Sequence, residues 1–236
     1  MPLRRACDLS APERADIIRH SEIGVGADEA LVERLALCAV AFDFRSRRVI
    51  YRDGEQADAL YLSARGRVKL CRLDPDSGRE AVIDILPAGS LFGESALFAG
   101  DVRQMCAVAF ENVRALRLPV ADFRQVMGEN RELYDHTFKL VGQRLARSEM
   151  RVADFALDAI PTRLAKLLAE LSTRYGRHGD DGVLIDLALP HREIASIVGS
   201  TRESITVRLN DMRRAGMIDF VDRKILIKHP PEAATL

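Results

Sequence analysis

Residues 190–214, PHREIASIVGSTRESITVRLNDMRR, predict two short helices joined by a tight turn. Gly199 is expected to end the first helix, because glycine readily adopts the left-handed conformation that follows many helices. A small residue at Ala195, a glycine four residues later and the β-branched Ile205 six residues after that have the spacing of a helix-turn-helix. Two helices can cross steeply only where small residues meet, so this spacing decides the fold of the segment.

The second helix of this pair is predicted to begin with a capping box. The Ser200 hydroxyl is expected to accept a hydrogen bond from the free backbone amide of Glu203. The Glu203 carboxylate would in turn accept one from the backbone amide of Ser200. Ile205, Leu209 and Met212 repeat at i, i+4 and i+7 and are expected to form the buried side of the helix.

The opposite face of the second helix carries side chains that suit a DNA duplex. Arg202 can grip guanine through two acceptors, Glu203 can accept from cytosine, and Val207 can lie against a thymine methyl group. Side chains near the helix starts, such as His191, suit phosphate contact. The predicted DNA-binding residues are Arg192, Ser200, Thr201, Arg202, Glu203, Thr206, Val207, Arg208 and Asn210. The alternative interpretation is a solvated charged face on a helical hairpin.

Residues 216–227 predict a two-stranded wing after this hairpin. Ile218 to Val221 and Ile225 to Ile227 are apolar runs separated by a turn at Asp222-Arg223-Lys224. From residue 188 to residue 229, eight Arg and Lys stand against five Asp and Glu, although the whole chain has 35 of each sign. The basic side chains therefore gather on the predicted DNA-binding element, and no overall positive charge is needed to explain binding.

Length and composition limit the class of protein further. A chain of 236 residues can form one large or two modest domains. No run of 18 apolar residues occurs, so no membrane span is expected, and no apolar segment follows Arg4 and Arg5 as a signal peptide requires. The four cysteines lack a CxxC spacing, so neither a disulfide framework nor a zinc site is expected. We therefore expect a cytoplasmic protein without metal ligands.

The amino-terminal half predicts helices at residues 11–19 and 28–41, followed by many short strands up to about Leu118. Glycines at intervals of roughly twelve residues separate these strands, as in a small all-β barrel or sandwich. The predicted strands are Arg48–Tyr51, Ala59–Ser63, Arg67–Leu73, Ala81–Leu86, Met105–Ala109 and Val113–Leu118.

One turn within this region, GSLFGESALF at residues 89–98, has the features of an anion site. Gly93 permits a turn with free amides, and residues 96–98 can form one helical turn. Arg103 could neutralise a bound phosphate, and Glu94 could accept from a ribose hydroxyl. An ordinary barrel turn is the alternative interpretation.

A long helix is predicted from about residue 130 to residue 159, with apolar residues at heptad spacing. We expect this seam to join two parallel copies, although a helix lying on its own barrel is the alternative. The predicted interface residues are Phe138, Val141, Leu145, Ser148, Val152 and Phe155. Beyond it, residues 119–127 and 162–175 predict flanking helices, 176–182 a polar loop and 183–189 a strand.

The order of these parts resembles the cyclic-AMP receptor/FNR family of bacterial transcription regulators. Its most specific matches are REIASIVGSTRESI (192–205) and GSLFGESALF (89–98). The resemblance implies an α+β fold with a cyclic-nucleotide-binding-like β-roll (jelly roll) at 1–118, a helical linker and dimerisation helix at 119–159, and a winged helix-turn-helix at 160–236. It also implies a homodimer on a palindromic double-stranded DNA site, and RNA polymerase contact through residues 176–182. An enzyme is not expected, because no catalytic set, metal spacing or P-loop occurs.

The chain departs from the cyclic-AMP-binding members at two places. The resemblance implies effector contacts by Gly93, Glu94, Ser95, Arg103, Gln104 and Ser148, but Gln104 replaces a serine and Ser148-Glu149 replaces a Thr-Ser pair. The identity of the effector therefore stays open: it can be cyclic AMP, cyclic GMP or another signal, or the protein can have no effector at all. An iron–sulfur cluster is not expected with Cys7 alone near the amino terminus, and no histidine falls within the predicted barrel strands to hold haem. The alternative function is a cyclic-nucleotide-binding signalling module that acts through protein partners.

The recognition helix also departs from the family pattern. Arg202 and Glu203 match, but Val207 stands where a second arginine is common, and the nearest arginine is Arg208. On the helical wheel Arg208 lies at the edge of the buried face, where a long side chain can extend to phosphate. The half-site is therefore expected to lose one guanine contact.

Overall fold

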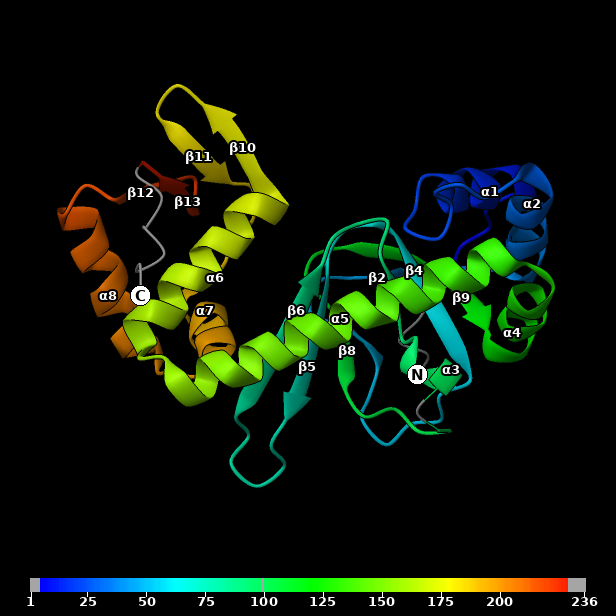
Figure 1. Cartoon of the computed structure of the whole chain (residues 1–236), viewed down its shortest axis with the longest axis horizontal. Coiled ribbons are helices and arrows are strands. Elements are labelled where there is room, and N and C mark those ends of the chain that lie inside the picture. The colour runs from blue at the N-terminus through cyan, green and yellow to red at the C-terminus, as the bar shows by residue number, and fades with distance from the viewer. Residues whose placement is uncertain (1–4, 99, 229–236) are drawn as a thin grey trace. The chain divides into compact units, whose positions relative to one another are not determined.

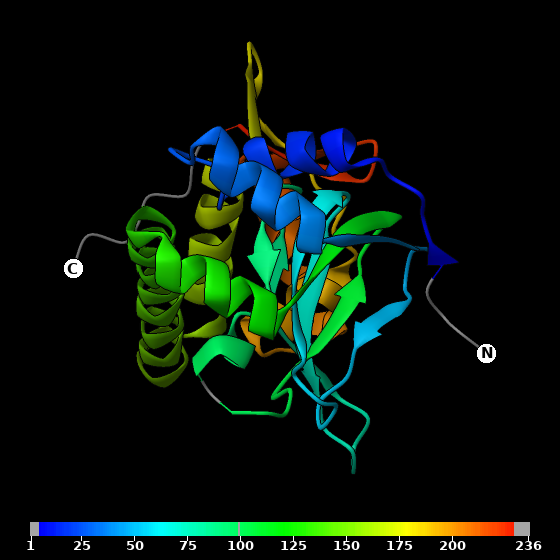
Figure 2. The same cartoon turned by 90° about the vertical axis from the view of Figure 1, so that its right-hand side faces the viewer.

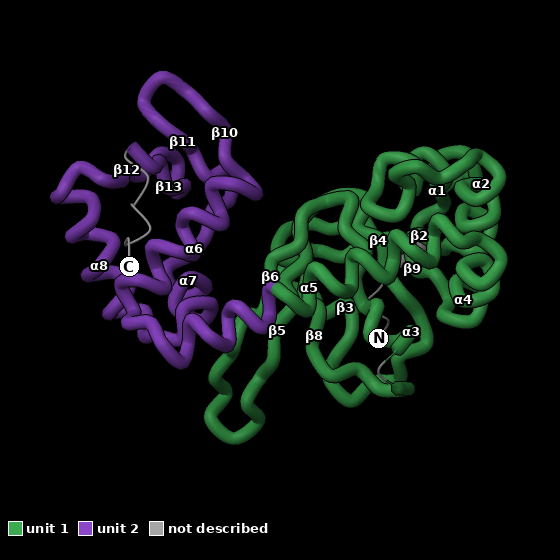
Figure 3. The backbone as a smooth tube through the Cα atoms, in the orientation of Figure 1, with its two compact units in different colours: residues 1–146 green, residues 147–236 purple. Residues whose placement is uncertain are grey.

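Residues 5–98 and 100–228 are described by the computed structural model, which divides into two units at residues 146 and 147 (Figure 3). The division lies within the longest helix, α5 (Arg131–Leu157). The ends of the first and last predicted domains, residues 1–4 and 229–236, lie outside the described residues.

Two antiparallel sheets form the β-roll of the first unit (Figure 1). One has the strand order β1-β2-β9-β4-β7, and the other has the order β3-β8-β5-β6. The strands are β1 (Arg5–Ala6), β2 (Val40–Phe44), β3 (Val49–Tyr51), β4 (Ala59–Arg65), β5 (Val68–Leu73), β6 (Glu80–Leu86), β7 (Leu91–Phe92), β8 (Cys106–Ala109) and β9 (Val113–Pro119).

Strand β4 shows why both faces of its sheet are apolar. Side chains alternate across a strand, so Leu60 and Leu62 face one core while Ala59 and Tyr61 face another. The first core lies under the helices of this unit, and the second lies between the two sheets. A strand buried on both sides reads as a continuous apolar run, which is how the sequence of β4 reads.

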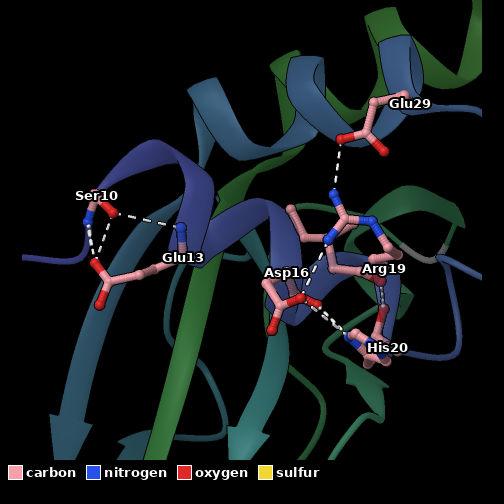
Figure 4. A network of polar contacts seen from close by, with 8 residues as sticks. Ser10, Glu13, Asp16, Arg19, His20 and Glu29 are labelled. Carbon is pink, nitrogen blue, oxygen red and sulfur yellow. Dashed lines mark hydrogen bonds and ion pairs between the residues drawn. The ribbon is translucent and has the colours of Figure 1, made fainter.

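Three helices cover the outer face of the five-stranded sheet: α1 (Ala11–Arg19), α2 (Glu29–Cys38) and α4 (Val120–Glu129) (Figure 2). A capping box starts α1, because the Ser10 hydroxyl accepts from the Glu13 amide and the Glu13 carboxylate accepts from Ser10 (Figure 4). Arg19 links α1 to α2 through an ion pair of 2.7 Å with Glu29. A short helix, α3 (Ser95–Phe98), follows β7.

The predicted barrel strands are all present, so the all-β interpretation of this region is confirmed. The predicted helix at residues 28–41 was too long. Ala39 ends α2 in an extended conformation, and β2 begins at Val40 to pair with β9. Phe42 and Phe44 supply the alternating apolar pattern of that strand, Val40 itself favours a strand, and the pairing with β9 overrides the helical propensity of Ala41.

Helix α5 has two apolar stripes. Leu133, Thr137 and Leu140 are buried within the first unit. The predicted seam runs along another stripe and is largely exposed in the single chain, with Leu145 at 59%. The exposed large apolar side chains of the seam are Tyr134, Phe138, Leu145, Val152 and Phe155. The first part of the helix thus lies on its own β-roll, as in the alternative interpretation, and the heptad stripe still keeps five large apolar side chains exposed.

The second unit contains α6 (Ile160–Tyr175), α7 (His191–Val198), α8 (Arg202–Arg214) and a four-stranded antiparallel sheet. The sheet order is β10-β11-β13-β12. Its strands are β10 (Gly176–Gly179), β11 (Gly182–Ile185), β12 (Ile218–Val221) and β13 (Lys224–Ile227). The predicted wing is confirmed as the β12–β13 hairpin, which turns through positive φ angles at Asp222 and Arg223.

Residues 176–182 were predicted to be a polar loop, and this was wrong. Gly176 to Gly179 form strand β10, which pairs with β11 across a turn at Asp180 and Asp181. The error arose because the side chains of β10 are largely exposed, so the strand has no apolar alternation to reveal it. No helix among the described residues is long and apolar enough to cross a membrane. The α+β class, with its β-roll, long helix and winged helix-turn-helix, is confirmed.

Candidate DNA-binding and effector-binding sites

The turn between α7 and α8 depends on Gly199 for two reasons. Its φ is 68° and its ψ is 50°, a left-handed conformation that strains other residues. A Cβ atom at this position would also lie 2.6 Å from the Phe155 ring of α5. Ala195 and Ile205 are buried on either side of the turn, as predicted. The small residues therefore allow α7, α8 and the end of α5 to approach one another closely.

The predicted capping box at Ser200 was wrong, because α8 begins one residue later. Thr201 is the N-cap, and its hydroxyl accepts from the Ser204 amide at 3.2 Å. The Ser200 hydroxyl is buried and has no hydrogen-bond partner among the described residues. Gly199 reverses the chain in a left-handed conformation, and Ser200 then belongs to the turn. The N-cap of α8 therefore falls at Thr201 instead of Ser200.

The outward face of α8 presents most of the predicted DNA-binding side chains. Arg202, Glu203, Val207, Arg208 and Asn210 are exposed, and Val207 reaches 56%. Ile205 and Leu209 are fully buried on the inner face, with Met212 half-buried. Arg208 was placed at the edge of the buried face, and its side chain is exposed. The helix therefore offers one continuous polar surface with a single exposed aliphatic residue at its centre.

The predicted residues outside α8 lie at the rim of this surface. Arg192 is exposed at the start of α7, with an ion pair of 3.5 Å to the buried Glu193. Thr201 is exposed at the N-cap of α8, whereas Ser200 is half-buried. Arg192 and Thr201 are thus free to face a partner, and Ser200 contributes to the turn.

His191 joins three parts of the second unit. Its Nδ1 atom lies 2.8 Å from the Thr206 hydroxyl of α8, and its ring packs on Phe220 of the wing at 6.0 Å between centroids. The Thr206 hydroxyl also donates to the Arg202 carbonyl at 2.8 Å. Thr206 is consequently half-buried and oriented by His191, so this residue positions α8 rather than facing outward.

The pKa of His191 lies below its ordinary value, because burial and then the charge of Arg202 disfavour the imidazolium. The unfolded chain therefore binds more protons than the folded chain as the pH falls below about 6.5. We expect the free energy of unfolding of the second unit to fall on acidification through this window and to be unaffected by His191 above it. The measurement is calorimetric unfolding of the wild type and His191→Asn between pH 7.5 and about 5. Equal pH slopes for the two proteins would contradict the assignment.

Arg103 is the centre of the second candidate site, in the β-roll. Its guanidinium lies 4.2 Å from the centroid of the Tyr51 ring and is only 2% exposed. Its Nη1 atom donates to the Gly93 carbonyl at 3.0 Å, and its Nη2 atom donates to the Ala59 carbonyl. The Nε atom has no hydrogen-bond partner among the described residues. A buried cation held only by carbonyls and rings is incompletely satisfied, which suits an incoming anion.

Glu94 and Gly93 lie beside Arg103, as predicted, but another residue already holds Glu94. The Arg144 guanidinium of α5 donates to Glu94 at 2.7 Å through Nη1. Its Nη2 atom lies 3.3 Å from Glu22 and donates to the Leu91 carbonyl. Arg144 was missed from the sequence, although it continues the 4-3-4 spacing of Leu133, Thr137 and Leu140, the buried stripe of α5. That spacing is the signal by which Arg144 could have been found.

The remaining predicted effector residues lie at different depths. Ser95 is half-buried at the start of α3, and Gln104 is exposed beside Arg103. Ser148 and Glu149 are exposed on the part of α5 that belongs to the second unit. The structure thus brings Gly93, Glu94 and Arg103 together within the β-roll, whereas Gln104, Ser148 and Glu149 face outward.

Sequence comparisons give the relatives of this chain. A cyclic nucleotide-binding domain model matches residues 42–130, and a Crp-like helix-turn-helix domain model matches residues 162–232. A global nitrogen regulator of Synechococcus elongatus is 31% identical over 224 residues, which cover 94% of this chain and 96% of that protein. A CRP-like cAMP-activated global transcriptional regulator of Mycobacterium tuberculosis is 28% identical over 212 residues, covering 90% and 94%. These relatives are transcription regulators, and not enzymes.

Solved structures have the same fold. FixK2 from Bradyrhizobium japonicum superposes with a TM-score of 0.72 at 21% identity, covering 81% of this chain and 93% of that one. The c-di-GMP responsive regulator CLP of Xanthomonas campestris gives 0.74 at 20% identity, covering 86% and 100%. The chain therefore belongs to the cyclic-AMP receptor/FNR family of bacterial transcription regulators, in which an effector-binding β-roll is joined to a helix-turn-helix DNA-binding domain.

Proposed function

We propose that this regulator acts as a homodimer that places two α8 helices in successive major grooves of a palindromic DNA site. The observation that carries the proposal is the exposed heptad stripe of α5, which is the kind of surface that a parallel two-stranded coiled coil buries. A two-fold dimer of helix-turn-helix units reads two half-sites related by the same symmetry.

Within each half-site, the exposed face of α8 is assigned to the bases and the surrounding residues to the backbone. Arg202 and Glu203 lie in the first turn of α8, where a recognition helix meets base edges. Arg192 and Thr201 at the helix starts, and Arg208 on α8, are assigned to phosphates, and Asn210 is assigned to a phosphate or a neighbouring base. Thr206 and Ser200 are assigned to positioning, since both are half-buried.

The β-roll is proposed to bind a small anionic effector at Arg103. Support comes from the incompletely satisfied guanidinium of Arg103 and from the left-handed Gly93 beside it, where a Cβ atom would lie 2.7 Å from Arg103 Nη1. A cyclic nucleotide fits this chemistry, because its phosphate is an anion and its ribose hydroxyl can donate to Glu94. Binding of the ribose would draw Glu94 away from Arg144 of α5, which links the site to the dimerisation helix.

The test of this function is selection from a randomised duplex pool by the purified protein, with cyclic AMP, with cyclic GMP and without nucleotide. Enrichment of a two-fold-symmetric site is expected, with binding that weakens steeply with salt, since each neutralised phosphate adds about 0.9 to the log–log slope. Enrichment only with nucleotide identifies the effector class, and Arg103→Gln then serves as the matched control. A pool without enrichment under any condition would favour the signalling-module alternative.

Replacing Val207 by arginine is expected to change the preferred base at one position of each half-site. Val207 is exposed in the second turn of α8, so an arginine there reaches guanine without disturbing the core. The measurement is the same pool selection with the wild type and Val207→Arg. An identical base preference for both proteins would show that position 207 does not face a base.

RNA polymerase contact is assigned to the β10–β11 hairpin. Residues 177–181 are exposed at its tip. In reconstituted transcription, alanine at Asp180 and Asp181 is expected to reduce activation without changing DNA affinity. A parallel loss of both would instead place the hairpin at the DNA.

A further inference from the structure

Cys71 and Cys106 face each other across two neighbouring strands of the β-roll. They are directly paired in the antiparallel register of β5 and β8. The adjacent pair in that register, Leu70 and Ala107, points into the core between the sheets. Because side chains alternate along a strand, both cysteines therefore lie on the opposite, outer face of the same sheet.

Polar groups cover the two thiols at this outer face. The exposed fraction is 0% for Cys71 and 6% for Cys106. The Asp53 amide donates to Cys106 Sγ at 3.4 Å, and the Cys71 thiol hydrogen-bonds the Glu80 side chain. Glu80 in turn pairs with the buried Lys69 at 2.7 Å. Among the described residues, the Asp53 amide and the Glu80 side chain thus contact the two thiols, and the buried Val82 is the register partner of Cys71 on β6.

The register also suits a covalent bond. Facing residues of an antiparallel pair have Cβ atoms about 4.5–5.5 Å apart, and a disulfide requires about 3.5–4.5 Å. A movement of about 1 Å between two such Cβ atoms therefore brings them into the range that a disulfide requires. All four cysteines of the chain are free thiols; Cys38 ends α2, and Cys7 lies in the segment between β1 and α1.

We propose that Cys71 and Cys106 form a redox-active dithiol that small-molecule disulfides such as glutathione disulfide oxidise to an intramolecular disulfide. The Cys106 thiolate attacks one sulfur of the reagent, and one glutathione leaves. The Cys71 sulfur then attacks Cys106 Sγ, and the second glutathione leaves as a thiol that takes up the proton lost by Cys71. Two protein thiols and one glutathione disulfide thus become one protein disulfide and two glutathione thiols.

The two cysteines have different parts in this reaction. Burial, followed by the hydrogen bond and charge of Glu80, raises the pKa of the Cys71 thiol, so Cys71 is not the first nucleophile. Cys106 is the more exposed of the pair and reacts first. The disulfide would close a loop over residues 72–105, which contains Glu94 and Arg103. Residues 53–55 contact both Cys106 and the backbone of Arg103, so the bond would stiffen the frame of the anion site.

The test uses the full chain carrying Cys7→Ser and Cys38→Ser, incubated folded with glutathione disulfide, then alkylated in denaturant and mapped by peptide mass spectrometry. Both thiols are expected to disappear together, with the two cysteine peptides linked. Adding Cys71→Ser is expected to leave Cys106 as a stable mixed disulfide with glutathione, and adding Cys106→Ser is expected to leave Cys71 unreacted.

Two thiols that persist in the folded chain, while the same chain in denaturant oxidises fully, would overturn the proposal and show that the pair serves packing alone. Glutathione on Cys106 without a link to Cys71 in the double variant would overturn it as well. If the chain carrying Cys7→Ser and Cys38→Ser does not fold, peptide mapping of the oxidised wild type shows equally whether the Cys71 and Cys106 peptides are linked. None of these outcomes depends on DNA or effector binding, so the result stands apart from the proposed function.

Discussion

Leu145→Glu is expected to convert the proposed dimer into monomers. Leu145 lies in the middle of the exposed stripe of α5, where a parallel partner would bring the two copies of the residue together. Two carboxylates would then be buried without partners, and each costs at least about 1.4 kcal/mol. The dimer dissociation constant is therefore expected to rise by about 100-fold or more. Sedimentation velocity over a concentration series measures it directly.

Gln143→Glu is the matched control for this variant. Gln143 is exposed on the same helix, two residues before Leu145 and about 200° from it around the helix axis, and the change adds the same charge. It is expected to leave both dimerisation and affinity for a palindromic duplex unchanged. Leu145→Glu is expected to lose that duplex while it retains the circular dichroism of the wild type. A dimer that persists in Leu145→Glu would place the interface elsewhere on the molecule.

Among substitutions on α8, Arg202→Ala is expected to give the largest loss of specific DNA binding. The residue is exposed in the first turn of α8, and it lies outside the hydrophobic core, so its removal leaves the fold intact. Loss of a bidentate contact to guanine is worth about 1–3 kcal/mol in each half-site, or about 2–6 kcal/mol for a dimer. Affinity for the selected site is expected to fall about 30-fold or more, and base preference at that position to relax.

Arg208→Ala is the control that distinguishes a contact to a base from the general attraction of a positive charge to DNA. It removes the same charge from the same helix, but Arg208 is assigned to phosphate. Binding is expected to weaken about equally for the selected site and for random duplex, with the salt slope reduced by about 1 for each half-site. Titrations at several salt concentrations measure both effects. If Arg202→Ala weakened both duplexes equally, its contact would be to phosphate, and the assignment of bases on α8 would be wrong.

Much of the fold could be predicted because its patterns are local. The heptad of α5, the apolar repeat of α8 and the strand–glycine alternation of the β-roll each depend on residues within one or two turns of chain. Gly199 was correctly predicted as the end of α7 for the same reason, since a left-handed residue is a local requirement. The family motifs at residues 89–98 and 192–205 then connected these parts to a regulator of transcription.

The errors came where the sequence pattern is ambiguous and pairing decides the structure. Val40 to Phe44 became a strand because β9 offers a partner at the right register. Residues 176–179 became β10 through pairing with β11, without an apolar pattern of their own. The cap of α8 moved from Ser200 to Thr201, a shift of one residue that sequence alone does not resolve.

By itself the sequence determined the class of fold, the order of the parts, the two faces of α8 and the seam of α5, because helical and strand periodicity are written along the chain. Only the tertiary structure decided that Arg144 holds Glu94, that His191 orients Thr206, and that Cys71 faces Cys106. Each of these pairs joins residues from different elements. Their distance depends on strand register and helix packing, which are set by the burial of many apolar side chains at once.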